Sequence, residues 1–161
     1  MQRLLFCLAL GALWLLNEPA LSAIPGRPDP ADVQMIEACL TDAQKDKSDP
    51  DACIGKAAAA CGQTTTGPSA EQNCIDREYL VWDSAANSDF ERLSARLPDN
   101  ESKQALRDAK RAYLLAKLKP CGFARIVHKD AREAALTSAR CNVKTVARYD
   151  LWLRDVIDSF K

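Results

Sequence analysis

The chain has 161 residues, in which 22 Lys and Arg balance 22 Asp and Glu to give a formal net charge of zero at pH 7. Such a balance lacks the basic footprint that binding to DNA or RNA requires, so no nucleic-acid partner is expected. Residues 24–161 have the usual length of one domain with one hydrophobic core. We therefore expect a single domain that follows a short leader.

The leader, residues 1–23, has the three parts of a signal peptide. Arg3 precedes the apolar run 4–16, and a polar break and small residues follow, up to Ala23. The apolar run is shorter than the roughly 20 residues that a membrane-spanning helix needs. We therefore expect removal of the leader, a periplasmic or secreted location, and no stable insertion into a membrane.

Six cysteines follow the leader, an even number. They are Cys39, Cys53, Cys61, Cys74, Cys121 and Cys141. An even set in an exported chain predicts three disulfides. No pair has the two-residue spacing of a zinc knuckle or a thioredoxin-like redox motif, and His128 is the only histidine. Neither a metal site nor a cofactor is therefore expected.

Helix geometry limits how these cysteines pair. Cys121 and Cys141 flank the same irregular stretch, so we expect them to pair. Cys53 and Cys61 lie in one predicted helix with a rise between them of about 12 Å, beyond the reach of about 7 Å that a disulfide allows. Neighbouring pairs are preferred for the first four cysteines, and one alternative stays open. The two arrangements are Cys39–Cys53 with Cys61–Cys74, and Cys39–Cys61 with Cys53–Cys74.

Apolar residues recur at helical spacing along the chain, and no stretch alternates as a β-strand does. The predicted helices span about 30–44, about 50–61, from Ser69 to Pro98, from Asp99 or Asn100 to Pro120, and about 130–160. Asp-Pro pairs at 29–30 and 49–50 are start signals, and Ser69 with Gln72 forms a capping box. The predicted fold class is all-α, a small bundle of about five helices stapled by three disulfides.

The third predicted helix has the clearest apolar stripe, at Ile75, Tyr79, Trp82, Ala86, Phe90, Leu93 and Leu97. Its spacing, with no polar group converging on it, favours core packing over a ligand groove.

The fourth helix repeats the stripe at Leu106, Ala109, Tyr113 and Ala116, and the last helix at Val146, Tyr149, Leu153, Val156 and Phe160. Pro120 and Gly122 are expected to end the fourth helix. The third and fourth helices are expected to form an antiparallel hairpin.

Catalysis has no constellation of residues to support it. The sequence contains no Gly-rich phosphate loop and no nucleophile elbow. The carboxylate pairs Asp76 with Glu78 and Asp83 with Asp89 are expected on a solvated helix surface, not as a general acid and base. We therefore expect a binding protein and not an enzyme, with no catalytic residue.

An ordered set of short motifs occupies about residues 70–155. Residues 74–78 read Cys-Ile-Asp-Arg-Glu, and Trp82-Asp83, Asn87 and Phe90 follow them. Residues 106–113 read Leu-Arg-Asp-Ala-Lys-Arg-Ala-Tyr; then come Cys121 and Cys141, with Thr145, Arg148 and Leu151 after the second cysteine. This set resembles the LprI-like family of lysozyme inhibitors.

The chain also departs from that family. Lys110-Arg111 and Tyr113 stand where the family usually has Gln-Arg and Trp. A charged, alanine-rich stretch at 122–140 replaces a loop that contains Gly-Thr, and residues 30–62 lie outside the resemblance. The resemblance implies an exported helical protein that inhibits a lysozyme.

Charge supports a protein partner. Residues 24–97 carry 7 Lys and Arg against 13 Asp and Glu, whereas residues 98–161 carry 14 against 8. The acidic part includes four candidate partner-binding residues, Asp42, Asp46, Asp49 and Asp51. Common lysozymes are basic and carboxylates attract them, so the first hypothesis is a lysozyme inhibitor. The alternative is a structural or stress-related envelope protein that binds another envelope component without inhibiting an enzyme.

Overall fold

The computed structural model describes residues 26–160, which contain five α-helices, one short 3-10 helix and no strand. The elements are α1 (Pro30–Asp46), η1 (Pro50–Cys53), α2 (Lys56–Thr64), α3 (Ala70–Arg96), α4 (Asn100–Val127) and α5 (Ala131–Ser159). The all-α prediction is therefore confirmed. The predicted signal peptide lies outside the described residues.

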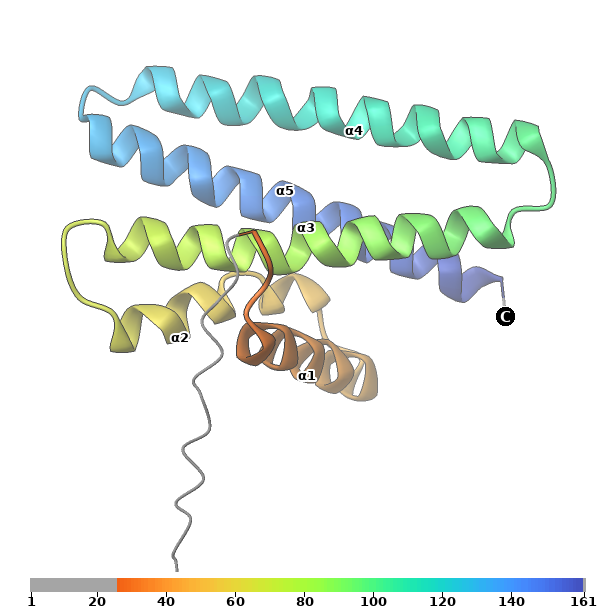
Figure 1. Cartoon of the computed structure of the whole chain (residues 1–161), viewed down its shortest axis with the longest axis horizontal. Coiled ribbons are helices and arrows are strands. Elements are labelled where there is room, and N and C mark those ends of the chain that lie inside the picture. Colours follow the sequence, from red (N-terminus) through yellow and green to blue (C-terminus); the bar gives the residue numbers. More distant parts are fainter. Residues whose placement is uncertain (1–25, 161) are drawn as a thin grey trace, which may run out of the picture.

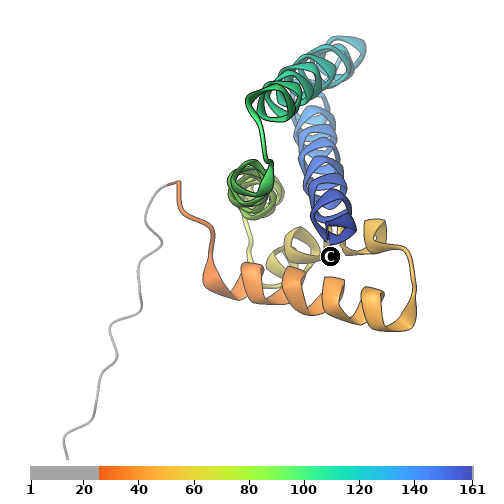
Figure 2. The same ribbon diagram turned by 90° about the vertical axis from the view of Figure 1, so that its right-hand side faces the viewer.

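The long helices α3 and α5 form the centre of the molecule, and their packing is the most extensive in it (Figure 1). Helix α4 lies along the outer side of α5, while α1, η1 and α2 lie on the opposite side of the α3 and α5 pair (Figure 2). The predicted hairpin of the third and fourth helices is thus wrong in one respect. Helix α4 does run back antiparallel to α3, but α5 supplies most of its packing.

The core consists mainly of apolar side chains from α3 and α5, together with Ile36 of α1, Cys53 of η1, Ala57 of α2 and Leu106 of α4. Trp82, Leu93 and Leu153 are among its fully buried members. The stripe predicted for α3 is buried or half-buried along its whole length. In contrast, Ala116 and Phe160 are exposed, and Ile157 is the last buried residue of α5. Phe160 follows the last residue of α5, so it lies outside the buried stripe.

Helix α4 is attached to α5 by few residues. Only Leu106 and Cys121 are buried among its 28 residues. Tyr113 stacks on Tyr149 of α5, with ring centroids 4.0 Å apart. The prediction that Pro120 and Gly122 end this helix is wrong, because α4 continues to Val127. A proline in a helix removes only one backbone hydrogen bond, and here the disulfide at the next residue fixes that turn on α5.

The second predicted helix is in fact two elements. Gly55 has a φ of 96°, a left-handed conformation that glycine adopts without strain, and it separates η1 from α2. Cys53 and Cys61 therefore do not share a helix, although the conclusion that they do not pair is correct. The predicted capping box is also wrong, since the Ser69 side chain makes no capping hydrogen bond.

Three disulfides join elements that are neighbours in the chain. Cys39–Cys53 links α1 to η1, Cys61–Cys74 links α2 to α3, and Cys121–Cys141 links α4 to α5, with Cα–Cα distances of 5.8, 5.5 and 5.4 Å. This is the preferred arrangement of the two that the sequence left open. It is possible because each short connection returns the chain antiparallel to the element before it.

Candidate functional site

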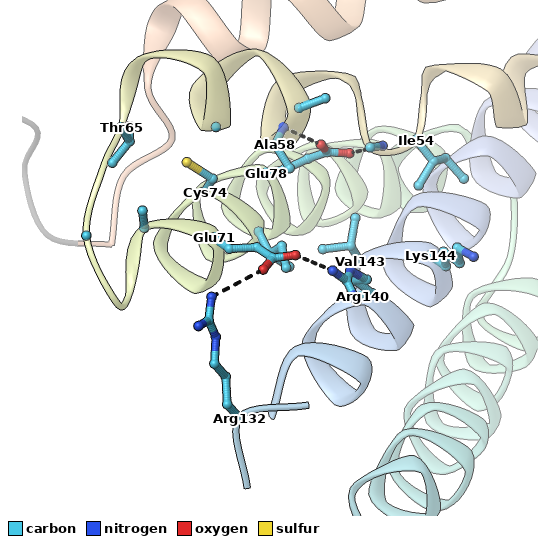
Figure 3. A pocket seen from close by; sticks show the side chains of 16 residues that line it. Ile54, Ala58, Thr65, Glu71, Cys74, Glu78, Arg132, Arg140, Val143 and Lys144 are labelled. Carbon is cyan, nitrogen blue, oxygen red and sulfur yellow. Dashed lines mark hydrogen bonds and ion pairs between the residues drawn. The ribbon is translucent and has the colours of Figure 1, made fainter. Parts of the chain in front are cut away.

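A hollow of about 590 Å³ opens between α2, the N-terminal part of α3, and α5 (Figure 3). Much of its wall consists of small residues, namely Ala58, Ala59, Gly62, Gly67 and Ala70. Because these residues have little or no side chain, α2 leaves space in front of Ile75 on α3 and Val143 on α5. The volume lies within the range of clefts that hold a ligand of moderate size.

Glu78 forms the base of this hollow and is fully buried. Its Oε1 accepts hydrogen bonds from the Gly55 backbone N–H at 2.6 Å and from Trp82 Nε1 at 3.0 Å. Its Oε2 accepts one from the Ala58 backbone N–H at 2.8 Å. Buried polar groups are stable when they are hydrogen-bonded in this way.

The Glu78 side chain thereby supplies the acceptor that Gly55, the N-cap residue of α2, lacks. Gly55 has no side chain to bind the unpaired N–H groups of the first turn, so a carboxylate from α3 takes that role. The prediction that Glu78 lies on a solvated surface is therefore wrong. A signal was present, because Glu78 lies three residues after Ile75 and four before Trp82, within the apolar stripe.

Three cations stand on the rim of the hollow, all on or near α5. Arg132 and Arg140 both pair with Glu71 of α3, the former at 3.8 Å (Figure 3). Lys144 is exposed, and no hydrogen bond or ion pair to another described residue engages it. The rim therefore carries more positive than negative charge over an apolar wall. The sequence did not single out these three residues, because they are far apart from α2 along the chain.

The four predicted partner-binding aspartates are not one group of free carboxylates. Asp42 and Asp46 are exposed on the last turns of α1. Asp49 instead caps η1, since its side chain accepts the backbone N–H of Asp51 at 2.9 Å. Asp51 forms an ion pair with Arg148 of α5 at 2.7 Å. Asp42 and Asp46 thus differ from Asp49 and Asp51, whose side chains also have a partner within the protein.

A second polar cluster joins α1, α3 and α5 away from the hollow. Arg154 of α5 pairs with Asp150 at 2.8 Å, with Asp89 of α3 at 3.3 Å and with Glu37 of α1 at 2.6 Å. Burial raises the pKa of Asp150 to about 7, although Arg154 opposes this shift. Asp89 is also buried, so its predicted place on a solvated surface is wrong.

The shifted pKa of Asp150 predicts a pH dependence of stability. Between pH 4 and 7 the folded state holds a proton on this carboxyl that the unfolded state has lost, so raising the pH destabilises the fold. Asp150→Asn removes this titration. The free energy of unfolding of the variant minus that of wild type should therefore rise by about 3 kcal/mol from pH 5 to pH 8. Urea unfolding at the two pH values measures this change.

Asp155→Asn provides the control for that measurement. Asp155 is exposed on the same helix, so its substitution should give the same difference from wild type at both pH values. A pH-independent difference for Asp150→Asn would mean that Asp150 is ionised throughout this range in the folded protein.

Neither a cluster of metal-ligating side chains nor a membrane-spanning helix is found within residues 26–160. Within residues 26–160, no group of three or more His, Cys, Asp or Glu could hold a metal ion. No helix in this part of the chain is long and apolar enough to cross a membrane. The Glu78 oxygens are already bonded to the protein itself, so the hollow is suited to binding by shape and charge.

Comparison with known proteins gives one match. No curated protein and no solved structure matches the chain. A family model described as lysozyme inhibitor LprI matches residues 39–149. The match begins earlier than the resemblance over 70–155, so it includes the first three cysteines of the described fold and every residue that lines the hollow. The chain belongs to the LprI family of lysozyme inhibitors.

Proposed function

We propose that this protein is exported and inhibits a lysozyme by binding it. The observation that carries the proposal is the family match over residues 39–149, which covers α2, α3 and α4 completely. Three disulfides are typical of proteins that work in the periplasm or outside the cell, where a lysozyme is met.

The hollow beside α2 is the proposed anchor for the partner. Tight protein interfaces depend on a few side chains that insert into well-packed pockets. The apolar wall at Ile75 and Val143 suits an apolar side chain, while Arg140 and Lys144 suit an acidic or carbonyl group next to it. A protruding segment of the lysozyme that combines these two features fits the hollow.

Asp42 and Asp46 have a different proposed role. They are exposed and one turn apart on α1, and within the described residues they make no ion pair. Exposed carboxylates attract a basic protein over a distance and so increase the association rate more than they slow dissociation. They would therefore guide a basic lysozyme toward the inhibitor.

Binding kinetics on immobilised basic c-type lysozyme test both roles. Ala59→Phe fills the hollow from an exposed position on α2, and we expect it to speed dissociation by at least about tenfold. Asp42→Asn with Asp46→Asn should slow association by about threefold at low ionic strength and by less at 1 M salt, where the Debye length falls to about 3 Å.

Matched substitutions serve as controls. Ala95→Phe adds the same bulk at an exposed position of α3, and Glu91→Gln with Glu133→Gln removes the same charge from exposed positions of α3 and α5. These variants should bind as wild type does. If the wild-type protein binds but Ala59→Phe dissociates no faster than Ala95→Phe, the hollow is not the anchor.

A further inference from the structure

The outer face of α4 is apolar, which is unusual for a helix at the edge of a molecule. Both views place α4 as the outermost layer, on the far side of α5 from α1 (Figures 1 and 2). Its second half carries six large apolar side chains that are between 43% and 80% exposed. They are Leu114, Leu115, Leu118, Phe123, Ile126 and Val127, and we call them the α4 apolar face.

The position of these residues on the helix explains their exposure. Cys121 is the only buried residue between 114 and 127, and its disulfide to Cys141 turns that side of the helix toward α5. At 100° per residue, Leu115 and Ile126 fall about 120° or more away from Cys121 around the axis. Leu115, Phe123, Ile126 and Val127 therefore point away from α5, whereas Leu118 lies about 60° and Leu114 about 20° from Cys121, on the flank nearer to α5. The four that point outward, flanked by Leu118 and Leu114, form an exposed apolar surface of the kind that marks an interaction site.

The charged residues in the segment that carries this patch are all positive. Residues 109–129 contain six Lys and Arg and no Asp or Glu. Three of these cations are engaged within the protein, since Lys110 donates to Asn87 at 3.0 Å, Lys117 donates to Tyr79, and Arg111 pairs with Asp108. Lys119, Arg125 and Lys129 have no hydrogen bond or ion pair with any other described residue. Free cations thus accompany the apolar residues.

We propose that α4 lies on the surface of an anionic lipid bilayer, with its apolar face in the headgroup boundary. A helix that presents Leu, Ile and Phe together with Lys and Arg binds such a surface without crossing it. Lys119 lies among the apolar residues, and its long stem allows the ammonium group to reach the lipid phosphates. The proposal concerns a surface distinct from the hollow and does not depend on lysozyme binding.

Charge argues against two other occupants of this face. A second copy of the chain would bring the unpaired cations of two α4 helices together, where they repel each other. A basic lysozyme would meet the same repulsion. An anionic bilayer satisfies both features of the face, because it offers negative charge above an apolar layer.

Sedimentation with lipid vesicles tests the proposal on the oxidised protein, purified after export and with leader removal confirmed by mass. The protein should bind vesicles of phosphatidylglycerol and phosphatidylcholine on the order of a hundredfold more strongly than vesicles of phosphatidylcholine alone, because its three free cations are attracted to the anionic lipid. Leu118→Glu with Ile126→Glu should weaken binding to the anionic vesicles by at least about tenfold. These side chains are 66% and 80% exposed, so the fold should survive their replacement.

Two further variants complete the test. Ala95→Glu with Ala105→Glu makes the same change in net charge at exposed positions outside the face, and it should weaken binding by no more than about threefold. Lys119→Gln with Arg125→Gln keeps the apolar residues and should weaken binding by about tenfold or more. Circular dichroism confirms helix content for each variant.

Several results would overturn the assignment. Equal binding to the two kinds of vesicle, or equal loss in the face variant and its control, would remove the lipid surface as the partner. A dimer in sedimentation equilibrium that Leu118→Glu with Ile126→Glu dissociates would assign the face to a second copy. Loss of lysozyme binding in that variant, without vesicle binding by the wild type, would assign the face to the lysozyme.

Discussion

Replacing Glu78 by alanine is expected to lower the free energy of unfolding by at least about 3 kcal/mol, because the change leaves the buried Trp82 Nε1–H and the part-buried backbone N–H groups of Gly55 and Ala58 without their acceptor. Each orphaned buried donor costs about 1–3 kcal/mol, and the first turn of α2 loses its cap as well. Glu78→Gln should lower the free energy of unfolding by less, because its amide oxygen still accepts a hydrogen bond. Some loss should remain, because its amide nitrogen cannot accept one. Urea unfolding followed by circular dichroism measures both effects.

Glu91→Ala is the matched control for this substitution. Glu91 is an exposed glutamate on the same helix, so its loss should change stability by no more than about 0.5 kcal/mol. A loss for Glu78→Ala as small as that of Glu91→Ala would show that the Glu78 carboxylate does not hold α2 on α3. The hollow would then need another explanation for its shape.

The second large effect is expected from the disulfide of α4. Cys121→Ala with Cys141→Ala should lower the free energy of unfolding by about 3 kcal/mol, since the cross-link closes a loop of 20 residues. The loss should also have a local signature. Because Leu106 and Cys121 are the only buried residues of α4, backbone amides at 114–127 should exchange with deuterium much faster in this variant.

Removing the Cys39–Cys53 disulfide provides the comparison. That bond spans 14 residues, so its loss should destabilise the protein by a similar amount, but α4 should keep its protection from hydrogen exchange. If amides at 114–127 remained equally protected in both variants, α4 would be held on α5 by packing at Tyr113 and Leu106 alone.

The sequence predicts the helices well because local signals determine them. Asp29 caps α1 as expected, with its side chain accepting the Ala31 N–H at 2.9 Å. The apolar stripe of α3 is read directly from its spacing. The disulfide ladder follows from the short connections between these helices.

The parts that could not be predicted depend on contacts between distant segments. Their charge marked Glu78 and Asp89 as surface residues, because the partners that stabilise them in the interior lie on α2 and α5. The break at Gly55 needed knowledge of the cap from α3, without which an alanine-rich stretch reads as one helix. In the second half of α4, apolar residues occur on two faces, and only the Cys121–Cys141 bond decides which face meets α5.

The same reasoning applies to the candidate site. The sequence grouped Asp42 and Asp46 with Asp49 and Asp51, and it could not show that Asp49 caps η1 or that Asp51 pairs with Arg148. It could not reveal the hollow, because a hollow results from small side chains on α2 facing α5 across space. Its cationic rim comes from a segment that is charged and alanine-rich in the sequence.

The central claim, that this member of the LprI family inhibits a lysozyme, is tested most directly by the rate at which a basic c-type lysozyme clears bacterial cell walls. The oxidised protein, titrated into a fixed amount of enzyme, should lower that rate until about one equivalent has been added, and it should have little further effect beyond that point. Reduced and alkylated protein serves as the control and should leave the rate unchanged. Undiminished clearing by several types of lysozyme, with the oxidised protein well in excess of each enzyme, would contradict the claim.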